Sequence, residues 1–62
     1  MIEEGDIVMV AWKNLPLEKA EILRTPRGEG GLWQIRYIPS NIEQAINPYS
    51  DEFICFQKQG GE

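Results

Sequence analysis

The chain has 62 residues, one cysteine, no histidine, and ten acidic against six basic side chains, which gives a formal net charge of −4. One cysteine forms no intramolecular disulfide, and a structural zinc site needs about four Cys or His ligands, so neither device can stabilise a domain this small. The acidic balance also disfavours non-specific binding to nucleic acid, which depends on a basic surface.

The apolar content of 42% is ordinary for a globular domain. The chain opens Met1-Ile2-Glu3-Glu4, without the basic start of a signal peptide. Its longest apolar run, residues 7–12, is far shorter than the roughly 20 residues that span a bilayer. We therefore expect one cytoplasmic domain over residues 1–62, with no membrane contact and with a polar tail at 58–62 that frays.

Residues 7–12 follow a turn at Gly5-Asp6 and are rich in β-branched and aromatic side chains, which predicts a strand. Almost every position is apolar, so this strand is either covered on both faces or covered on one and open for binding on the other. Pro16 ends it, because proline cannot donate to a central ladder.

Residues 17–25 are ambiguous between helix and strand. Glu18 to Arg24 have helical propensity, but the segment is about two turns long, which is marginal for a helix. Ala20 and Ile22 also alternate with polar neighbours, and proline and glycine flank the segment on both sides. This pattern favours a strand.

The remaining elements are easier to assign. A loop rich in glycine and proline covers 25–31. Residues 32–38 predict a strand with Trp33, Ile35 and Tyr37 on one face, and 42–46 predict a shorter strand after a turn at 39–41. Residues 47–51 predict a turn or a single 3₁₀ turn, and 52–57 the last strand.

Five short strands spaced about ten residues apart predict an all-β fold, as one antiparallel barrel or sandwich. Closure of such a barrel removes exposed sheet edges, which a short chain has little material to cover. We expect the core to contain Val8, Ala20, Ile22 and Ile35.

The order of these elements resembles SH3-like barrels of the Tudor, chromo-barrel and KOW kind. The residues that carry the resemblance are Gly5 to Val10, Ala20 to Leu23, Trp33 to Tyr37, and the turn of 48–51 before Glu52 to Ile54. The resemblance covers roughly residues 4–57. It implies a five-stranded antiparallel SH3-like barrel with a short 3₁₀ turn before the last strand.

Tudor-type members bind methylated Lys or Arg in a cage of aromatic rings. The resemblance implies that such rings would come from Trp12, Trp33, Tyr37, Tyr49 and Phe53. This chain has Pro39-Ser40-Asn41 at the turn where typical Tudor domains carry a further aromatic and acidic cluster. Similar small barrels also serve as accessory subunits of larger enzymes.

We expect a non-catalytic binding module or accessory subunit with a protein partner, as a monomer or weak homo-oligomer. Trp12 ends an apolar strand beside a proline-containing loop and is the ring most expected to be partly exposed, whereas Trp33 and Tyr37 are expected in the core. The candidate partner-binding residues are Trp12, Leu15, Leu17, Tyr37, Tyr49 and Phe53.

The alternative is a small barrel that binds nucleic acid or another anion. Its candidate residues are Lys13, Arg24, Arg27 and Arg36, the arginines lying near a loop that contains Gly28, Gly30 and Gly31. Guanidinium groups and backbone N–H groups can together hold an anion. An ordinary hairpin loop with scattered surface charge explains the same residues.

Nothing in the sequence predicts catalysis, a cofactor or a metal. Cys55 has no histidine to activate it as a nucleophile. Five acidic residues can cluster if the two ends of the chain meet, but a solvated rim is the expected outcome; they are Glu3, Glu4, Asp6, Asp51 and Glu52.

Overall fold

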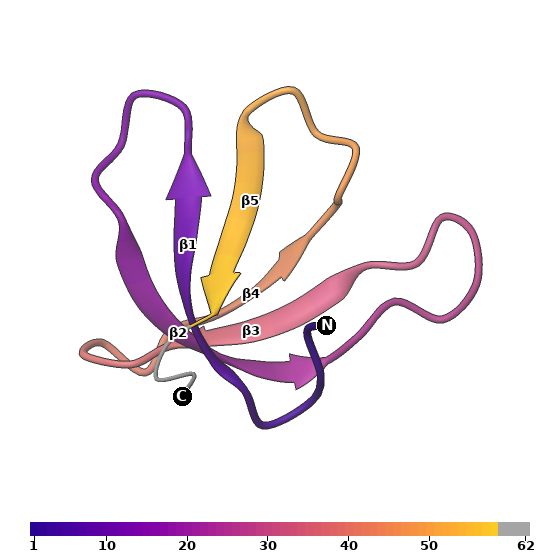
Figure 1. Cartoon of the computed structure of the whole chain (residues 1–62), viewed down its shortest axis with the longest axis horizontal. Coiled ribbons are helices and arrows are strands. Elements are labelled where there is room, and N and C mark those ends of the chain that lie inside the picture. Colours follow the sequence, from indigo (N-terminus) through magenta and orange to yellow (C-terminus); the bar gives the residue numbers. More distant parts are fainter. Residues whose placement is uncertain (59–62) are drawn as a thin grey trace.

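The computed structural model describes residues 1–58, which form one antiparallel sheet of five strands and contain no helix (Figure 1). The strands are β1 (Ile7–Trp12), β2 (Glu18–Arg24), β3 (Trp33–Tyr37), β4 (Glu43–Ile46) and β5 (Phe53–Lys58). The all-β prediction is confirmed, and so is the strand predicted within 17–25. Proline and glycine on either side of that segment leave too little length for a stable helix.

The strand order in the sheet is β4-β3-β2-β1-β5, so the chain runs as a meander and its last strand returns beside the first. β2 links the two halves of the sheet. Its first residues pair with β1, where Glu18 lies opposite Val10, and its last residues pair with β3, where Arg24 lies opposite Gln34. Figure 1 shows β2 bending between these partners, which curls the whole sheet.

The prediction of a closed barrel is wrong in one respect, because the curled sheet stays open between β4 and β5. Within residues 1–58 no ladder joins these two strands. β4 has only four residues, all of them used in pairing with β3. A strand this short gives the sheet little length with which to close.

The core lies inside the curl, and the predicted core residues Val8, Ala20, Ile22 and Ile35 are all fully buried. Val10 and Ile46 complete the cluster. Successive side chains of a strand point to opposite faces, so one buried position at every second residue is what a sheet with one covered face requires. Ala20 lies opposite both Val8 and Tyr37, at the point where β2 is paired on both sides.

Half-buried aromatic rings extend this core across the inner face. Trp33 packs on Phe56, Phe56 on Phe53, and Phe53 on Trp12, with ring centroids 4.9, 4.9 and 5.5 Å apart. A β-bulge makes this row possible: Ala11 pairs with Cys55 and Trp12 with Phe53, so the intervening residue of β5 has no partner. The extra residue re-aims the strand, and both phenylalanines therefore face inward.

The segment before β5 forms two successive β-turns, so the expected turn is present but a 3₁₀ turn is not confirmed. The Ser50 N–H donates to the Asn47 carbonyl at 3.0 Å, and the Phe53 N–H to the Ser50 carbonyl at 3.3 Å. These turns begin three residues apart, whereas a 3₁₀ helix repeats the bond at consecutive residues. The Asn47 side-chain oxygen also accepts a hydrogen bond from the Tyr49 N–H at 2.9 Å, which is the contact of an Asx turn.

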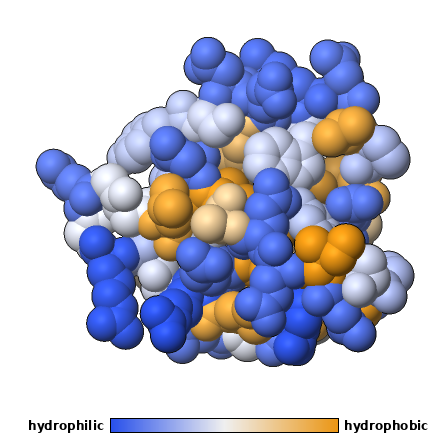
Figure 2. All heavy atoms as spheres, turned by 180° about the vertical axis from the view of Figure 1, so that it is seen from behind, coloured by the Kyte–Doolittle hydropathy of each residue, from blue (hydrophilic) through white to orange (hydrophobic). Residues whose placement is uncertain are grey.

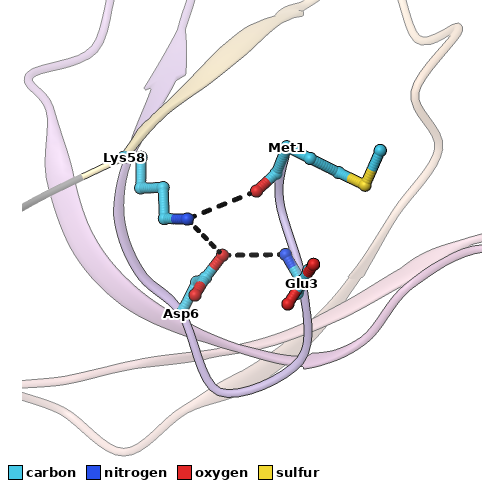
Figure 3. Close-up of polar contacts among 4 residues, drawn as sticks. All are labelled: Met1, Glu3, Asp6 and Lys58. Carbon is cyan, nitrogen blue, oxygen red and sulfur yellow. Dashed lines mark hydrogen bonds and ion pairs between the residues drawn. The ribbon is translucent and has the colours of Figure 1, made fainter. Parts of the chain in front are cut away.

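A small polar cluster joins the N-terminal segment to the end of β5 (Figure 3). The Asp6 carboxylate accepts from the Glu3 N–H at 2.8 Å and lies 3.4 Å from the Lys58 ammonium, which also reaches the Met1 carbonyl at 3.4 Å. Fraying was predicted to begin at Lys58, but this residue pairs with Val8 as the last residue of β5. The rest of the predicted tail, 59–62, lies outside the described residues.

This cluster predicts an acid-dependent loss of stability. The hydrogen bond from the Glu3 N–H lowers the pKa of Asp6 below its ordinary value of 3.8, and Lys58 acts in the same direction. A lowered folded-state pKa means that the carboxylate stabilises the fold above pH 3.8 and that this contribution is lost as the pH falls through the folded value. We expect Asp6→Asn to lower the melting temperature at neutral pH but not at strongly acidic pH.

The measurement is thermal unfolding by circular dichroism across the acid range. Asp51→Asn is the matched control, because Asp51 is an exposed carboxylate in the turn before β5 and forms no salt bridge in the described residues. A difference between Asp6→Asn and the wild type that stays the same at every pH would contradict the prediction.

Candidate functional site

A hollow opens at the end of the sheet where β1 ends and β2 begins. We call it the Trp12 hollow; its volume is about 330 Å³, and it is lined by Trp12, Leu15, Glu18, Tyr37, Gln44 and Glu52. Four of these residues lie in β1, β2, β3 and β4. Leu15 lies in the β1–β2 loop and Glu52 in the β4–β5 loop. Side chains far apart in the sequence meet here because the bend in β2 brings the two halves of the sheet together.

Two hydrogen bonds tie the wall of the Trp12 hollow together. The Trp12 indole N–H donates to the Tyr37 hydroxyl at 3.2 Å, and that hydroxyl donates to the Gln44 side-chain carbonyl at 2.6 Å. β1 has no backbone pairing with β3 or β4, so these bonds span the inside of the curl. They hold the indole and the phenol in defined positions beside the hollow.

The charged groups on this wall are both acidic, Glu18 at the start of β2 and Glu52 in the loop before β5. Partial burial raises the pKa of Tyr37 above 10.0, the negative charge of Glu18 raises it further, and the hydrogen bond from Trp12 opposes the shift. The phenol therefore stays neutral near pH 7 and keeps its proton for the bond to Gln44. The hollow carries negative charge beside neutral aromatic rings.

Two further depressions adjoin the Trp12 hollow, one smaller and one larger than it. One, of about 220 Å³, is lined by Leu17, Glu18, Lys19, Tyr37, Pro39 and Ser40. The other, of about 470 Å³, is lined by Lys13, Asn14, Leu15, Asp51 and Glu52. Shared lining residues make the three a continuous concave surface across this end of the molecule.

Apolar side chains are exposed beside this surface. Leu15 is 63% exposed and Leu17 is 47% exposed, both in the loop between β1 and β2. Asn14 gives this loop its reversal, with a positive φ of 62°, and the Leu15 N–H donates to the Trp12 carbonyl at 3.4 Å. From behind, the apolar residues of the molecule form separate groups divided by polar side chains (Figure 2).

Most of the predicted partner-binding residues are brought together. Trp12, Leu15 and Tyr37 line the Trp12 hollow, and Leu17 lines the adjoining depression. Phe53 does not line the hollow, but its ring makes an edge-to-face contact with the ring of Trp12, which does. Tyr49 is 80% exposed in the β4–β5 loop and lines none of these depressions, so the structure does not join it to the others.

Three residues of the hollow were missed from the sequence: Glu18, Gln44 and Glu52. A signal for Glu18 existed, because it lies two residues before Ala20 and therefore shares the inner face of β2. Gln44 lies opposite Ile35, also on the inner face, but this depends on the register of β3 and β4. Glu52 reaches the hollow because its carbonyl accepts from the Lys13 N–H at 2.9 Å, a contact that no local pattern predicts.

The structure brings only two of the four predicted basic residues together. Arg36 pairs with Glu21 across β2 and β3. Lys13 lies near the Trp12 hollow. Arg24 and Arg27 line a separate hollow of about 280 Å³ at the far end of β2, together with Thr25, Gly31, Leu32 and Gln34.

The acidic residues near the two ends of the chain also stay apart. Asp6 precedes β1 and pairs with Lys58, whereas Glu52 lies beyond the opposite end of β1. Among residues 1–58 no three acidic, cysteine or histidine side chains gather as metal ligands would. Cys55 is half-buried and free. This arrangement agrees with the expected solvated acidic rim.

Nor do these residues include a helix with the length and apolar character needed to cross a membrane. The Trp12 hollow has exposed Leu15 in its wall, and exposed Leu17 lies in the adjoining depression. Comparisons with protein-family models, with curated proteins and with solved structures gave no significant match to this chain.

Proposed function

We propose that this chain is a non-catalytic protein-binding module or accessory subunit whose partner docks at the Trp12 hollow. We also propose that the curled sheet is an open form of the SH3-like barrel. The meander with β5 beside β1 and the bend of β2 support this assignment.

The observation that carries the proposal is the position of Leu15 and Leu17 beside the Trp12 hollow. Contact of these two leucine side chains with water is unfavourable. A partner that covers them gains the free energy of burying their apolar surface. The hollow next to them has an aromatic wall and a few polar groups in fixed positions, which is the usual composition of a binding pocket. The Tyr37 hydroxyl donates a hydrogen bond to the Gln44 side chain, so these two polar groups satisfy each other within the wall of the hollow.

The test compares partner capture by the wild type with capture by Leu15→Asp. Ile54→Asp is the matched control, because Ile54 is similarly exposed, at 57%, but lies outside the hollow. We expect a protein retained by the wild type and by Ile54→Asp to be lost from Leu15→Asp in quantitative mass spectrometry. Identical sets of proteins on all three baits, with melting temperatures showing that each is folded, would contradict the proposal.

One observation favours a second candidate, binding of nucleic acid or another polyanion. The hollow beside Arg24 and Arg27 has no acidic side chain among its lining residues. An electrostatic complex with an oligonucleotide should be strongest at low salt, at about 50 mM, and should weaken in Arg27→Gln. Absence of binding at that salt concentration would rule this function out.

A further inference from the structure

We propose that the hollow beside Arg24 and Arg27 binds one phosphate monoester, whose phosphate is held by the two guanidinium groups and whose organic group is apolar. The inference goes beyond docking at the Trp12 hollow. It rests on the second candidate function and narrows its ligand from a polyanion to a single phosphate. We call the site the Arg24 hollow; its volume is about 280 Å³, and it is lined by Arg24, Thr25, Arg27, Gly31, Leu32 and Gln34.

Arg24 and Arg27 differ from the other basic residues in having no carboxylate beside them in the hollow that they line. Neither forms a salt bridge within residues 1–58, and no acidic side chain lines the Arg24 hollow. Of the other four basic residues, two form salt bridges and two lie in depressions that carboxylates also line; they are Arg36, Lys58, Lys13 and Lys19. The Arg24 hollow is therefore a local positive site on a chain of net charge −4.

The backbone brings the two arginines to one hollow from different segments. Arg24 ends β2 and lies opposite Gln34, just beyond a shift in the register of β2 and β3. The loop that follows closes on itself, because the Gly31 N–H donates to the Gly28 carbonyl at 3.4 Å. A Cβ atom at residue 31 would lie 2.7 Å from the Arg27 backbone nitrogen, so this approach requires a glycine.

The groups around the Arg24 hollow match a phosphate monoester. Such an ester carries a charge of about −1.5 to −2 at pH 7 and three strong acceptor oxygens. Each guanidinium offers paired N–H donors that fit phosphate, and the side chains of Thr25 and Gln34 add further donors. Leu32 is 43% exposed in the same lining, where it can contact an apolar organic group. The volume is close to the lower end of the range for ligand pockets, about 300 Å³, which suits a small ligand.

A nucleic-acid backbone fits this surface less well. Each phosphodiester has one charge, and binding depends on several basic residues along the path of the strand. Lys13 and Lys19 lie beyond or near the other end of β2, and Glu29 adds a negative charge to the loop without lining the hollow. A strand that extends past the Arg24 hollow therefore meets a predominantly acidic chain.

The experiment titrates the ¹⁵N-labelled full chain with phenyl phosphate, with its methyl diester and with an unphosphorylated oligonucleotide at about 50 mM salt. The amide signals of Gly28, Gly30 and Gly31 report on the loop, and the Trp12 indole signal is an internal control. We expect phenyl phosphate to shift the glycine signals with a dissociation constant of about 1 mM and both diesters to bind more weakly. Inorganic phosphate should also bind more weakly, because it lacks the contact with Leu32.

The pH dependence of this titration tests the need for a doubly charged phosphate. We expect the affinity for phenyl phosphate to fall by a factor of up to about ten between pH 7 and pH 5, because a monoester takes up a proton near pH 6. The chain has no histidine, and the charged groups that line the hollow are two arginines, so the ligand is the group that titrates. An affinity that is constant over this range would contradict binding of the dianion.

A capped phosphotyrosine peptide shows where the phosphate comes from. Binding tighter than that of phenyl phosphate assigns it to a phosphorylated side chain of a partner, and weaker binding assigns it to a free ester. Both results agree with the inference, since the group held by the two arginines is the same.

The arginines are tested in the combined variant Arg24→Gln, Arg27→Gln. We expect its dissociation constant for phenyl phosphate to rise at least about tenfold, since a lost charged contact is worth roughly that much. The matched control is the combined variant Lys13→Gln, Lys19→Gln, which removes the same charge outside the hollow and should leave the constant unchanged. Gly31→Ala keeps both arginines but displaces the loop at Arg27, so it should also weaken binding.

Three further results would overturn the inference: glycine signals that phenyl phosphate does not move, an unchanged constant in the arginine variant of a folded chain, or a diester that binds as tightly as the monoester. If the oligonucleotide binds more tightly than phenyl phosphate, the second candidate function stands and the single phosphate is wrong. If no anion binds, both are wrong. Docking at the Trp12 hollow is judged separately, by the loss of the captured partner in Leu15→Asp.

Discussion

Ile35→Ala is expected to cost about 3 kcal/mol of the free energy of unfolding, as large-to-small changes in a closed core do. Ile35 is fully buried in the central part of the sheet, where it lies opposite Ile22 in β2 and Gln44 in β4. A chain of this length has a stability of roughly 3–9 kcal/mol. The substitution therefore removes a large part of the stability, and urea unfolding followed by circular dichroism measures the loss.

Ile42→Ala is the matched control for this substitution. It deletes the same atoms from the turn before β4, where Ile42 is 61% exposed. We expect a change of no more than about 0.5 kcal/mol, as for most surface substitutions. Equal losses for the two variants would show that the centre of the curl does not hold the core described here.

Phe56→Ala is expected to have the second-largest effect, a loss of about 2–3 kcal/mol. The Phe56 ring lies 4.9 Å from that of Trp33 and 4.9 Å from that of Phe53, so its removal breaks the aromatic row in the middle. Aromatic pairs contribute beyond the area that they bury. The half-buried position of Phe56 sets the estimate below that for a fully buried phenylalanine, and urea unfolding again measures it.

Ile54→Ala is the control that tests the β-bulge. In a regular strand, residues 54 and 56 would share a face, and both substitutions would then be costly. The shift in register between β1 and β5 instead leaves Ile54 57% exposed while Phe53 and Phe56 pack on the core. We expect Ile54→Ala to cost less than about 0.5 kcal/mol. A loss comparable to that of Phe56→Ala would contradict the bulge.

The candidate site was predictable in part. Trp12 and Leu15 follow from local chemistry, since an apolar strand that runs into a proline-containing loop leaves its last ring and the loop leucine near solvent. Tyr37 was expected in the core, and it is half-buried there with its hydroxyl reaching the rim. The acidic character of the site was not foreseen, because Glu18 and Glu52 meet only through the pairing of β1 with β2 and with β5.

What the sequence alone determined is the set of strands and which side chains of β2 and β3 face inward. Alternation along a strand is a property of the local backbone, so Ala20 and Ile22 mark the buried face of β2 without knowledge of their partners. The open edge between β4 and β5, the bulge at residue 54 and the separation of Arg24 from Lys13 were decided only by the tertiary structure. Each of these depends on how distant strands pair and how strongly the sheet curls, and these pairings compete across the whole sheet rather than within one segment.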